Sequence, residues 1–222
     1  MMMRTFLWCF STAAIAAAQV ADYANSGYKT PEGRARVAGT LTAHDREQTQ
    51  KPRDLVQALG LEKGQAVADI GTGVGYMLPY LHQAVGADGK IFAEDIFPDF
   101  LEKAKARAAE QKLTNVSFIH GTERSAQLPP NSVNVVLVLD VYHHFDFPVE
   151  MLASIAKGLK NEGRLVIVDF YKQGFRDPKH IRLDEKEVIA EVESHGFRLL
   201  RTGPFTPDRQ YLAVFVKQQE KQ

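Results

Sequence analysis

The sequence contains almost no cysteine: Cys9 is the only one among its 222 residues. Because Cys9 lies within the first eighteen residues, a chain that started at Gln19 would have no thiol left to oxidise or to mispair. Such a chain is compatible with an oxidising compartment outside the cytoplasm.

The sequence also lacks a net charge, with 27 Lys and Arg residues against 27 Asp and Glu residues. No bulk electrostatic attraction to nucleic acid or to anionic lipid follows from this balance, which disfavours a nucleic-acid substrate. Internal repeats and low-complexity blocks are absent as well. With 45% hydrophobic residues, the chain is long enough for one α/β domain with a substantial core.

No hydrophobic run is long enough for a permanent membrane anchor. Residues 5–18 are uncharged, follow Arg4 and end in three alanines at 16–18, which together resemble a secretory signal peptide. We therefore predict a signal peptide over residues 1–18 and an exported, periplasmic or secreted protein if it is cleaved. The alternative is an ordinary N-terminal helix and a cytoplasmic protein. Oligomeric state stays open.

Residues 67–76 read Val-Ala-Asp-Ile-Gly-Thr-Gly-Val-Gly-Tyr, an apolar strand followed by alternating glycines. Glycines permit a sharp turn and close approach of a ligand to the backbone, which predicts a nucleotide pocket. The dinucleotide fingerprint G-x-G-x-x-G would need glycine at position 76, where the chain has Tyr76. This spacing argues against NAD.

A second apolar strand, 90–95, ends in Glu94 and Asp95. An acid at this position, about twenty residues after the glycines, can accept hydrogen bonds from both ribose hydroxyls. We predict that Asp95 takes the ribose. Glu94 could instead be a solvent-exposed strand end, and Asp69 could serve only to fix loop amides.

The remaining pattern alternates strands with helices, which implies a parallel sheet. Two final strands without a helix between them predict an antiparallel hairpin, joined through Gly203, Pro204 and Pro207. We predict an α/β fold: a Rossmann-like, doubly wound, three-layer α/β/α sheet, mostly parallel with a C-terminal antiparallel hairpin. The predicted strands are 67–70, 90–95, 116–120, 133–139, 164–169, 197–200 and 210–216. The predicted helices start at 52, 76, 98, about 149 and about 184.

Residues 19–50 are polar and interrupted by glycine and proline, so we expect an irregular N-terminal arm that covers the cofactor cleft. The domain itself is expected at 51–222. Residues 171–182 mix basic and aromatic side chains, as in a lid over the acceptor, although an ordinary solvated connection fits them equally.

The form Asp-x-Gly-x-Gly-x-Gly over residues 69–75 resembles the first motif of the class I S-adenosylmethionine-dependent methyltransferases. The resemblance covers roughly residues 50–216 and implies S-adenosylmethionine as cofactor. Where related enzymes hold the adenine amino group with an aspartate, this chain has Thr122 or Glu123. The cofactor-binding residues implied are Asp69, Gly71, Thr72, Gly73, Gly75, Glu94, Asp95, Thr122, Glu123 and Asp140.

The segment after the fourth strand, Asp140 to Phe145, contains Tyr-His-His-Phe and is similar to the corresponding segment of small-molecule methyltransferases. It lacks the Asn/Asp-Pro-Pro-Tyr pattern of enzymes that methylate adenine or glutamine amides, which disfavours those substrates. We therefore expect a small-molecule or lipid-like acceptor, methylated by in-line displacement. The alternative is an exported protein that binds S-adenosylmethionine or a nucleoside without catalysis.

The predicted catalytic residues are His143, His144 and Asp140, with one imidazole as the base that takes a proton from the acceptor. Either imidazole could instead pack beneath the loop. The two histidines could also bind a metal together with Asp140 and His180, but no spacing such as H-x-x-x-H supports this, so we predict no metal.

Overall fold

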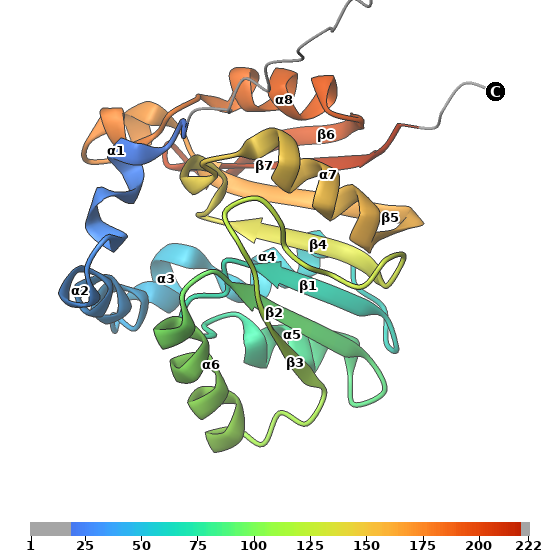
Figure 1. Cartoon of the computed structure of the whole chain (residues 1–222). Helices are drawn as coiled ribbons and strands as arrows, with labels where there is room; N and C mark the ends of the chain where they lie inside the picture. The colour runs from blue at the N-terminus through green and yellow to red at the C-terminus, as the bar shows by residue number, and fades with distance from the viewer. Residues whose placement is uncertain (1–18, 219–222) are drawn as a thin grey trace, which may run out of the picture.

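The computed structural model describes residues 19–218, so the predicted signal peptide lies outside the described residues. Seven strands form one sheet in the order β3-β2-β1-β4-β5-β7-β6 (Figure 1). The strands are β1 (Ala66–Ile70), β2 (Lys90–Asp95), β3 (Val116–His120), β4 (Val133–Leu139), β5 (Leu159–Phe170), β6 (Phe197–Thr206) and β7 (Gln210–Lys217). The helices are α1 (Asp22–Asn25), α2 (Pro31–Leu41), α3 (Arg46–Gln50), α4 (Pro52–Leu59), α5 (Leu78–Val85), α6 (Pro98–Glu110), α7 (Pro148–Gly158) and α8 (Glu185–Ser194). Four short 3₁₀ turns complete the described chain: η1 (Ser26–Tyr28), η2 (Tyr142–His144), η3 (Lys172–Gly174) and η4 (Pro178–His180).

The predicted fold class is confirmed by the pairing of the strands. β1 to β5 pair in parallel, and β7 runs antiparallel to both β5 and β6, which is the expected hairpin. The strand order reverses between β1 and β4, and open α/β sheets bind ligands in the crevice at the carboxyl ends of the strands beside such a point.

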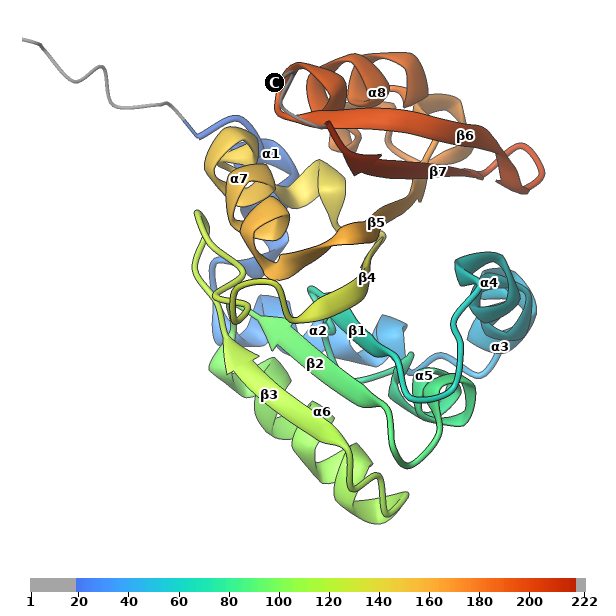
Figure 2. The same ribbon diagram turned by 90° about the vertical axis from the view of Figure 1, so that its right-hand side faces the viewer.

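Both faces of the sheet are covered by helices, which explains why the central strands are continuously apolar. Val136 and Leu137, neighbours in β4, belong to opposite hydrophobic clusters because strand side chains alternate between faces. One cluster packs against α7 and α8, and the other against α4, α5 and α6. The layers are visible edge-on in Figure 2. The three-layer prediction therefore holds.

Local signals fix several helix ends as the sequence predicts. α4 starts at Pro52 and stops at Gly60, whose φ of 57° is the left-handed conformation that ends helices. α8 begins close to the predicted 184 with a capping box: the Asp184 side chain accepts from the first turn and Glu187 accepts from the Asp184 N–H.

The prediction that residues 19–50 are irregular is wrong, because most of this arm is helical. Thr30 caps α2 through its hydroxyl, which accepts from the Gly33 N–H, and Pro31 occupies the first turn. This Thr-Pro start offsets part of the cost of the two glycines inside the helix, about 1 kcal/mol each.

The hairpin and β5 also differ in extent from the prediction. β6 continues through Gly203 and Pro204 to Thr206, leaving a turn of residues 207–209. β6 lies at the edge of the sheet, where a proline without an N–H is tolerated, and the register shifts between Pro204 and Thr206. β5 starts at Leu159 instead of the predicted 164.

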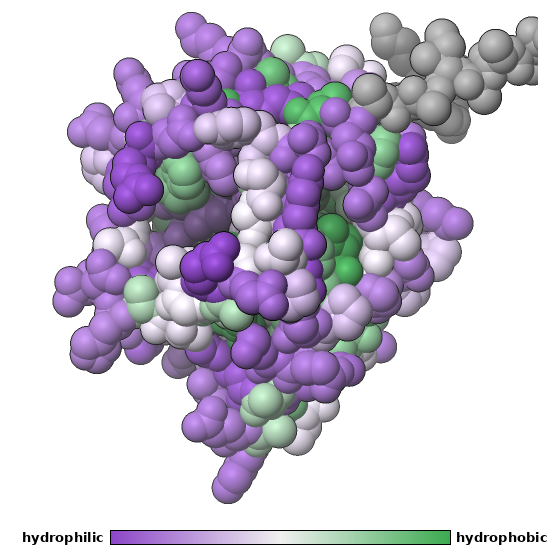
Figure 3. Space-filling view, turned by 60° about the vertical axis from the view of Figure 1, so that its left-hand side comes forward, coloured by the Kyte–Doolittle hydropathy of each residue, from purple (hydrophilic) through white to green (hydrophobic). Residues whose placement is uncertain are grey.

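The arm lies beside the sheet, to the left in Figure 1, and passes from α1, which contacts η2 and η4, to α3 near α4. Seen from this side, the molecular surface is mostly hydrophilic and is hollowed between side chains (Figure 3). Among the described residues, no helix has the length and apolarity needed to cross a membrane.

Candidate active site

A cavity lies at the carboxyl ends of β1, β2 and β4 and is closed on one side by the N-terminal arm. We call the side formed by Asp69, Gly71, Gly73, Glu94 and Asp95 the carboxylate wall. We call the side formed by Asn25, Tyr28, Asp140 and His144 the histidine wall. Both walls border the same space, as the strand order predicts.

Two glycines of the motif shape the carboxylate wall through positive φ angles. Gly71 has φ 68°, and a Cβ there would come within 2.6 Å of a Val141 methyl group. Gly73 has φ 56°, and a Cβ there would come within 2.9 Å of Leu41. Gly75 lies outside the cavity lining and packs against Ala104 of α6 instead, so it supports the fold of the loop.

Asp69 is buried and accepts a hydrogen bond from the Thr72 hydroxyl at 2.7 Å. Burial raises the pKa of Asp69 to about 7. Both residues border the cavity, so the structure brings Asp69 and Thr72 to the predicted site. Their mutual bond also holds the turn, through the Thr72 hydroxyl and not through the loop amides that the alternative named.

Glu94 and Asp95 end β2 with nearly buried carboxylates, 1% and 5% exposed. The alternative of an exposed Glu94 is therefore wrong. Asp95 accepts from the Gly73 N–H and the Phe97 N–H, each at 2.9 Å. Glu94 accepts from the Gly71 N–H at 3.3 Å through Oε2, while its buried Oε1 has no partner among the described residues. Burial raises the pKa of Asp95 to about 6 and that of Glu94 well above its usual range.

The two candidates for the adenine end differ in position. Glu123 borders the cavity. Thr122 is exposed, lies outside the lining of this cavity, and accepts from the Arg124 N–H. His120, at the end of β3, is exposed and also lies outside the lining.

Asp140 follows β4 directly, with φ 57°, a left-handed conformation uncommon for a residue other than glycine. The Gln210 amide donates to Asp140 Oδ1, and Arg46 Nη2 lies 3.9 Å from Oδ2. Burial, followed by the nearby Asp169 carboxylate, raises the pKa of Asp140 to about 6. Asp140 therefore borders the cavity, as predicted, and its carboxylate is fixed by Gln210 and Arg46.

The two adjacent histidines have different hydrogen-bond partners, and only His144 borders the cavity. His143 is 4% exposed and lies outside the cavity lining, with Nδ1 2.6 Å from Asp169 Oδ1. His144 borders the cavity, with Nδ1 2.8 Å from Asn25 Oδ1. Burial, together with His143 and His180 nearby, holds the pKa of His144 well below its usual value.

Tyr142, which precedes the two histidines, does not line the cavity. It is 1% exposed, belongs to the core beneath α8, and donates to Glu191 at 2.7 Å. Because η2 is a tight turn, its consecutive side chains point in different directions, and Tyr142 faces the core.

Several residues of this region were not predicted from the sequence, among them Asp169, Tyr28 and Arg46. Asp169, the penultimate residue of β5, holds His143 and could have been found as one more acid near a strand end. Tyr28 and Arg46 reach the cavity from the arm, where no motif marks them. Arg46 lies over the Tyr76 ring at 4.6 Å, and its buried Nε has no partner in residues 19–218.

Comparison with known proteins agrees with the family resemblance of the glycine motif. A family model described as a methyltransferase domain matches residues 61–211. The chain belongs to this methyltransferase family. The match includes the glycine turn, both strand-end acids and the two adjacent histidines. It confirms the predicted class I family and, together with the solved structure of an S-adenosylmethionine-dependent methyltransferase, the cofactor of that family, S-adenosylmethionine.

Relatives within the family are distant. An uncharacterised methyltransferase, YcgJ of Bacillus subtilis (strain 168), is 29% identical over 52% of this chain and 50% of its own length. The ubiquinone/menaquinone biosynthesis C-methyltransferase UbiE of a Marinomonas species (strain MWYL1) is 25% identical over 67% of this chain and 55% of its own. The chain thus spans about half the length of these curated relatives.

A solved structure agrees over most of the methyltransferase fold. The crystal structure of an S-adenosylmethionine-dependent methyltransferase from Aquifex aeolicus superposes with a TM-score of 0.78 at 25% identity. The superposition covers 83% of this chain and 98% of that one.

Proposed function

We propose that this protein transfers a methyl group from S-adenosylmethionine to a small-molecule or lipid-like acceptor. The observation that carries the proposal is the meeting, in one cavity, of the carboxylate wall and the His144 imidazole. Family membership supports the reaction class, and the geometry supports a division of roles between the two walls.

The carboxylate wall fits the cofactor. The unpaired Oε1 of Glu94 is a buried acceptor that lacks a donor within the described chain, which is costly unless a ligand hydroxyl supplies one. Asp95 and Glu94 would accept from ribose hydroxyls, and Glu123 from the adenine amino group. Several carboxylates also complement a ligand that carries a sulfonium and an ammonium.

When bound, S-adenosylmethionine supplies an electrophilic methyl group on its sulfonium. The residues of this chain mainly have to align the acceptor, an effect that contributes roughly 7–11 kcal/mol in well-oriented reactions. Tyr28 and Phe100 border the cavity and offer aromatic surface to an apolar, ring-containing acceptor. The quinone-related name of the UbiE relatives supports the same class of acceptor.

His144 is the better placed of the two adjacent imidazoles to take a proton from the acceptor, because it borders the cavity and His143 does not. Its depressed pKa keeps the ring neutral at neutral pH, so the proton-accepting form is populated. Asp140, held by Gln210 and Arg46, would orient the acceptor or the cofactor's methionine end.

Calorimetry with the full chain tests the cofactor half of the proposal. We expect S-adenosylmethionine to bind at micromolar concentration, NAD not to bind, and Asp95→Ala to weaken the sulfonium ligand by more than tenfold. A methyl-labelled cofactor and a panel of phenols, quinols and thiols then test transfer. Binding without product from any acceptor would favour the non-catalytic alternative, and no binding would refute the proposal.

We also propose that the protein is exported after cleavage before Gln19. N-terminal sequencing of the protein from fractionated cells tests this. A cytoplasmic chain that still begins at Met1 would refute export and would remove the question of how S-adenosylmethionine, a cytoplasmic product, reaches the site.

A further inference from the structure

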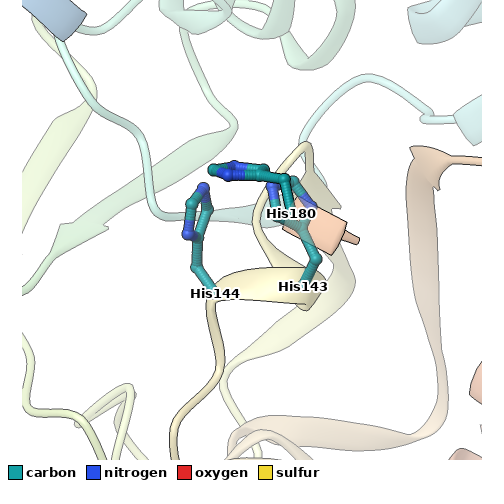
Figure 4. A group of neighbouring side chains, drawn as sticks. All are labelled: His143, His144 and His180. Carbon is teal, nitrogen blue, oxygen red and sulfur yellow. The ribbon is translucent and has the colours of Figure 1, made fainter. Parts of the chain in front are cut away.

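Three histidines from two separate segments come together beside the histidine wall. His143 and His144 are adjacent in η2, whereas His180 comes from η4, beyond β5. One ring nitrogen of each lies within 4.8 Å of the corresponding nitrogens of the other two. Figure 4 shows the three rings gathered at one point. We call this group the histidine cluster.

We propose that the histidine cluster binds one divalent transition-metal ion, with Zn²⁺ as the best match. Three imidazoles with an open fourth position are a common arrangement in zinc sites that take water or a substrate group. The proposal goes beyond methyl transfer and does not depend on it. It also departs from the expectation of no metal, which rested on local spacing alone.

Hydrogen bonds around His143 leave the correct ring nitrogen available. Asp169 Oδ1 lies 2.6 Å from Nδ1, and Asp169 also accepts from the His143 and Phe170 N–H groups. Because a carboxylate held in this way only accepts, Nδ1 carries the proton and Nε2 keeps its lone pair. A carboxylate behind a histidine is the usual outer partner of a metal ligand.

The same assignment follows for His144 from the orientation of Asn25. The Asn25 Nδ2 group donates to the His144 carbonyl at 3.0 Å and to Asp146 Oδ2 at 2.9 Å. The Asn25 carbonyl oxygen therefore faces His144 Nδ1, 2.8 Å away, and must accept its proton. His144 Nε2 is left with a lone pair, and the Tyr28 hydroxyl lies 3.5 Å from it, a long contact that a bound ion would displace.

His180 is the adjustable member of the cluster. Its ring stacks on Phe175 with centroids 4.8 Å apart and an interplanar angle of 8°. Bonds of 2.0–2.1 Å to a tetrahedral ion place ligand nitrogens about 3.4 Å apart, so closure requires shifts on the order of 1 Å. His180 is only half-buried, which leaves its side chain room for this movement. Asp140, part of the site considered from sequence, is instead engaged by Gln210 and Arg46.

Titration of the full chain with metal tests the proposal without any cofactor or acceptor. Protein stripped with a chelator is titrated with Zn²⁺ against a chromophoric competitor, and with Co²⁺ by visible absorption. We expect one Zn²⁺ per chain and the intense visible bands of four-coordinate Co²⁺. His180→Ala should weaken Zn²⁺ at least tenfold, and Asp169→Asn roughly 10- to 100-fold.

The matched control is His120→Ala, which removes an exposed histidine outside the cluster and should leave metal affinity unchanged. If His180→Ala fails to fold by circular dichroism, His144→Gln replaces it with the same expected loss. Less than one Zn²⁺ per chain, or wild-type affinity in the folded cluster variant, would overturn the proposal.

Metal binding would also decide the role of His144. An imidazole that binds an ion through Nε2 cannot accept a proton at that atom, so the base and the ligand roles exclude each other. Stoichiometric Zn²⁺ binding that is lost in His144→Gln would assign the ligand role.

Discussion

The carboxylate wall is built from residues close in sequence, whereas the histidine wall is assembled over long distances. Gly73 and Asp95, which share a hydrogen bond, are 22 residues apart, and their strands are direct neighbours. Asn25 and His144, which share another, are 119 residues apart. One wall is a local β-turn-α-β motif, and the other exists only after the arm docks on the sheet.

The two walls differ in how rigidly the fold holds them. A local motif is rigid because parallel pairing of β1 and β2 already fixes the turn and both acids. The histidine wall depends on Asn25 and Tyr28 from short helical segments with few buried residues. Elements of this kind belong to the less stable part of a fold, where ligand-dependent closure occurs. We therefore expect cofactor binding to depend on the carboxylate wall and to survive loss of the contact between Asn25 and His144.

The largest effect is expected from Gly71→Ala, which breaks the carboxylate wall. The substitution forces a side chain into φ 68° and against Val141, so we expect a loss of about 2–4 kcal/mol in stability. We also expect cofactor affinity to fall by more than 100-fold, measured by calorimetry. Gly64→Ala is the control, because φ is 80° there but nothing lies within 4 Å of the added Cβ. Equal effects from both variants would contradict the role given to Gly71.

Asp169→Asn tests the support behind the histidine wall, because Asp169 holds His143, the neighbour of His144. The carboxylate accepts from His143 Nδ1 and from two backbone N–H groups, and an amide has one acceptor oxygen fewer. We expect a loss of about 1–3 kcal/mol in urea unfolding. Cofactor affinity should change less than twofold, because Asp169 is outside the cavity lining. Asp88→Asn, at an exposed position, is the control and should stay within about 0.5 kcal/mol. A large loss of cofactor affinity would show that the walls are coupled.

The fold could be predicted because its signals are local and periodic. Strands β2, β3 and β4 have the predicted limits, and the hairpin follows from two strands without a helix between them. The arm could not be predicted in the same way. Its only clear helix signal is the Thr30-Pro31 start of α2, and the polar, glycine-containing sequence that follows hides a helix that packs through few apolar residues.

The same distinction holds within the site. Asp95 and Gly71 could be named because spacing along the chain determines where they lie. The meeting of His180 with His143 depends on how the segment after β5 folds back over η2, and no period or spacing encodes that path. The direction of the Tyr142 side chain could not be predicted either, because the backbone turn of η2 decides whether a side chain faces the cavity or the core.

Both stability and cofactor affinity should depend on pH through the carboxylate wall. Burial raises the pKa of Asp95 in this wall to about 6, above the ordinary 3.8. A folded-state pKa above the unfolded one favours folding when the group is protonated. This contribution to stability is therefore present below about pH 4 and is lost as the pH rises through 6. Ribose hydroxyls require the ionised form, so cofactor affinity should fall up to about tenfold per pH unit below 6. Calorimetry between pH 5 and 8 measures this, and Asp95→Asn should flatten the profile. A profile that is unchanged in the variant would exclude Asp95 as the titrating group.

The smallest effect is expected from Thr122→Ala, which separates the two candidates for the adenine end. The Thr122 side chain is exposed and outside the cavity lining, so its removal should change cofactor affinity by less than about twofold. Glu123→Gln alters a residue that borders the cavity, and loss of a charged acceptor should weaken binding by roughly three- to tenfold. Calorimetry on both variants, with adenosine as a second ligand, measures the difference at the adenine end. If Thr122→Ala weakened cofactor binding more than Glu123→Gln, the adenine contact would belong to Thr122. The cofactor site would then extend beyond the residues that line the cavity.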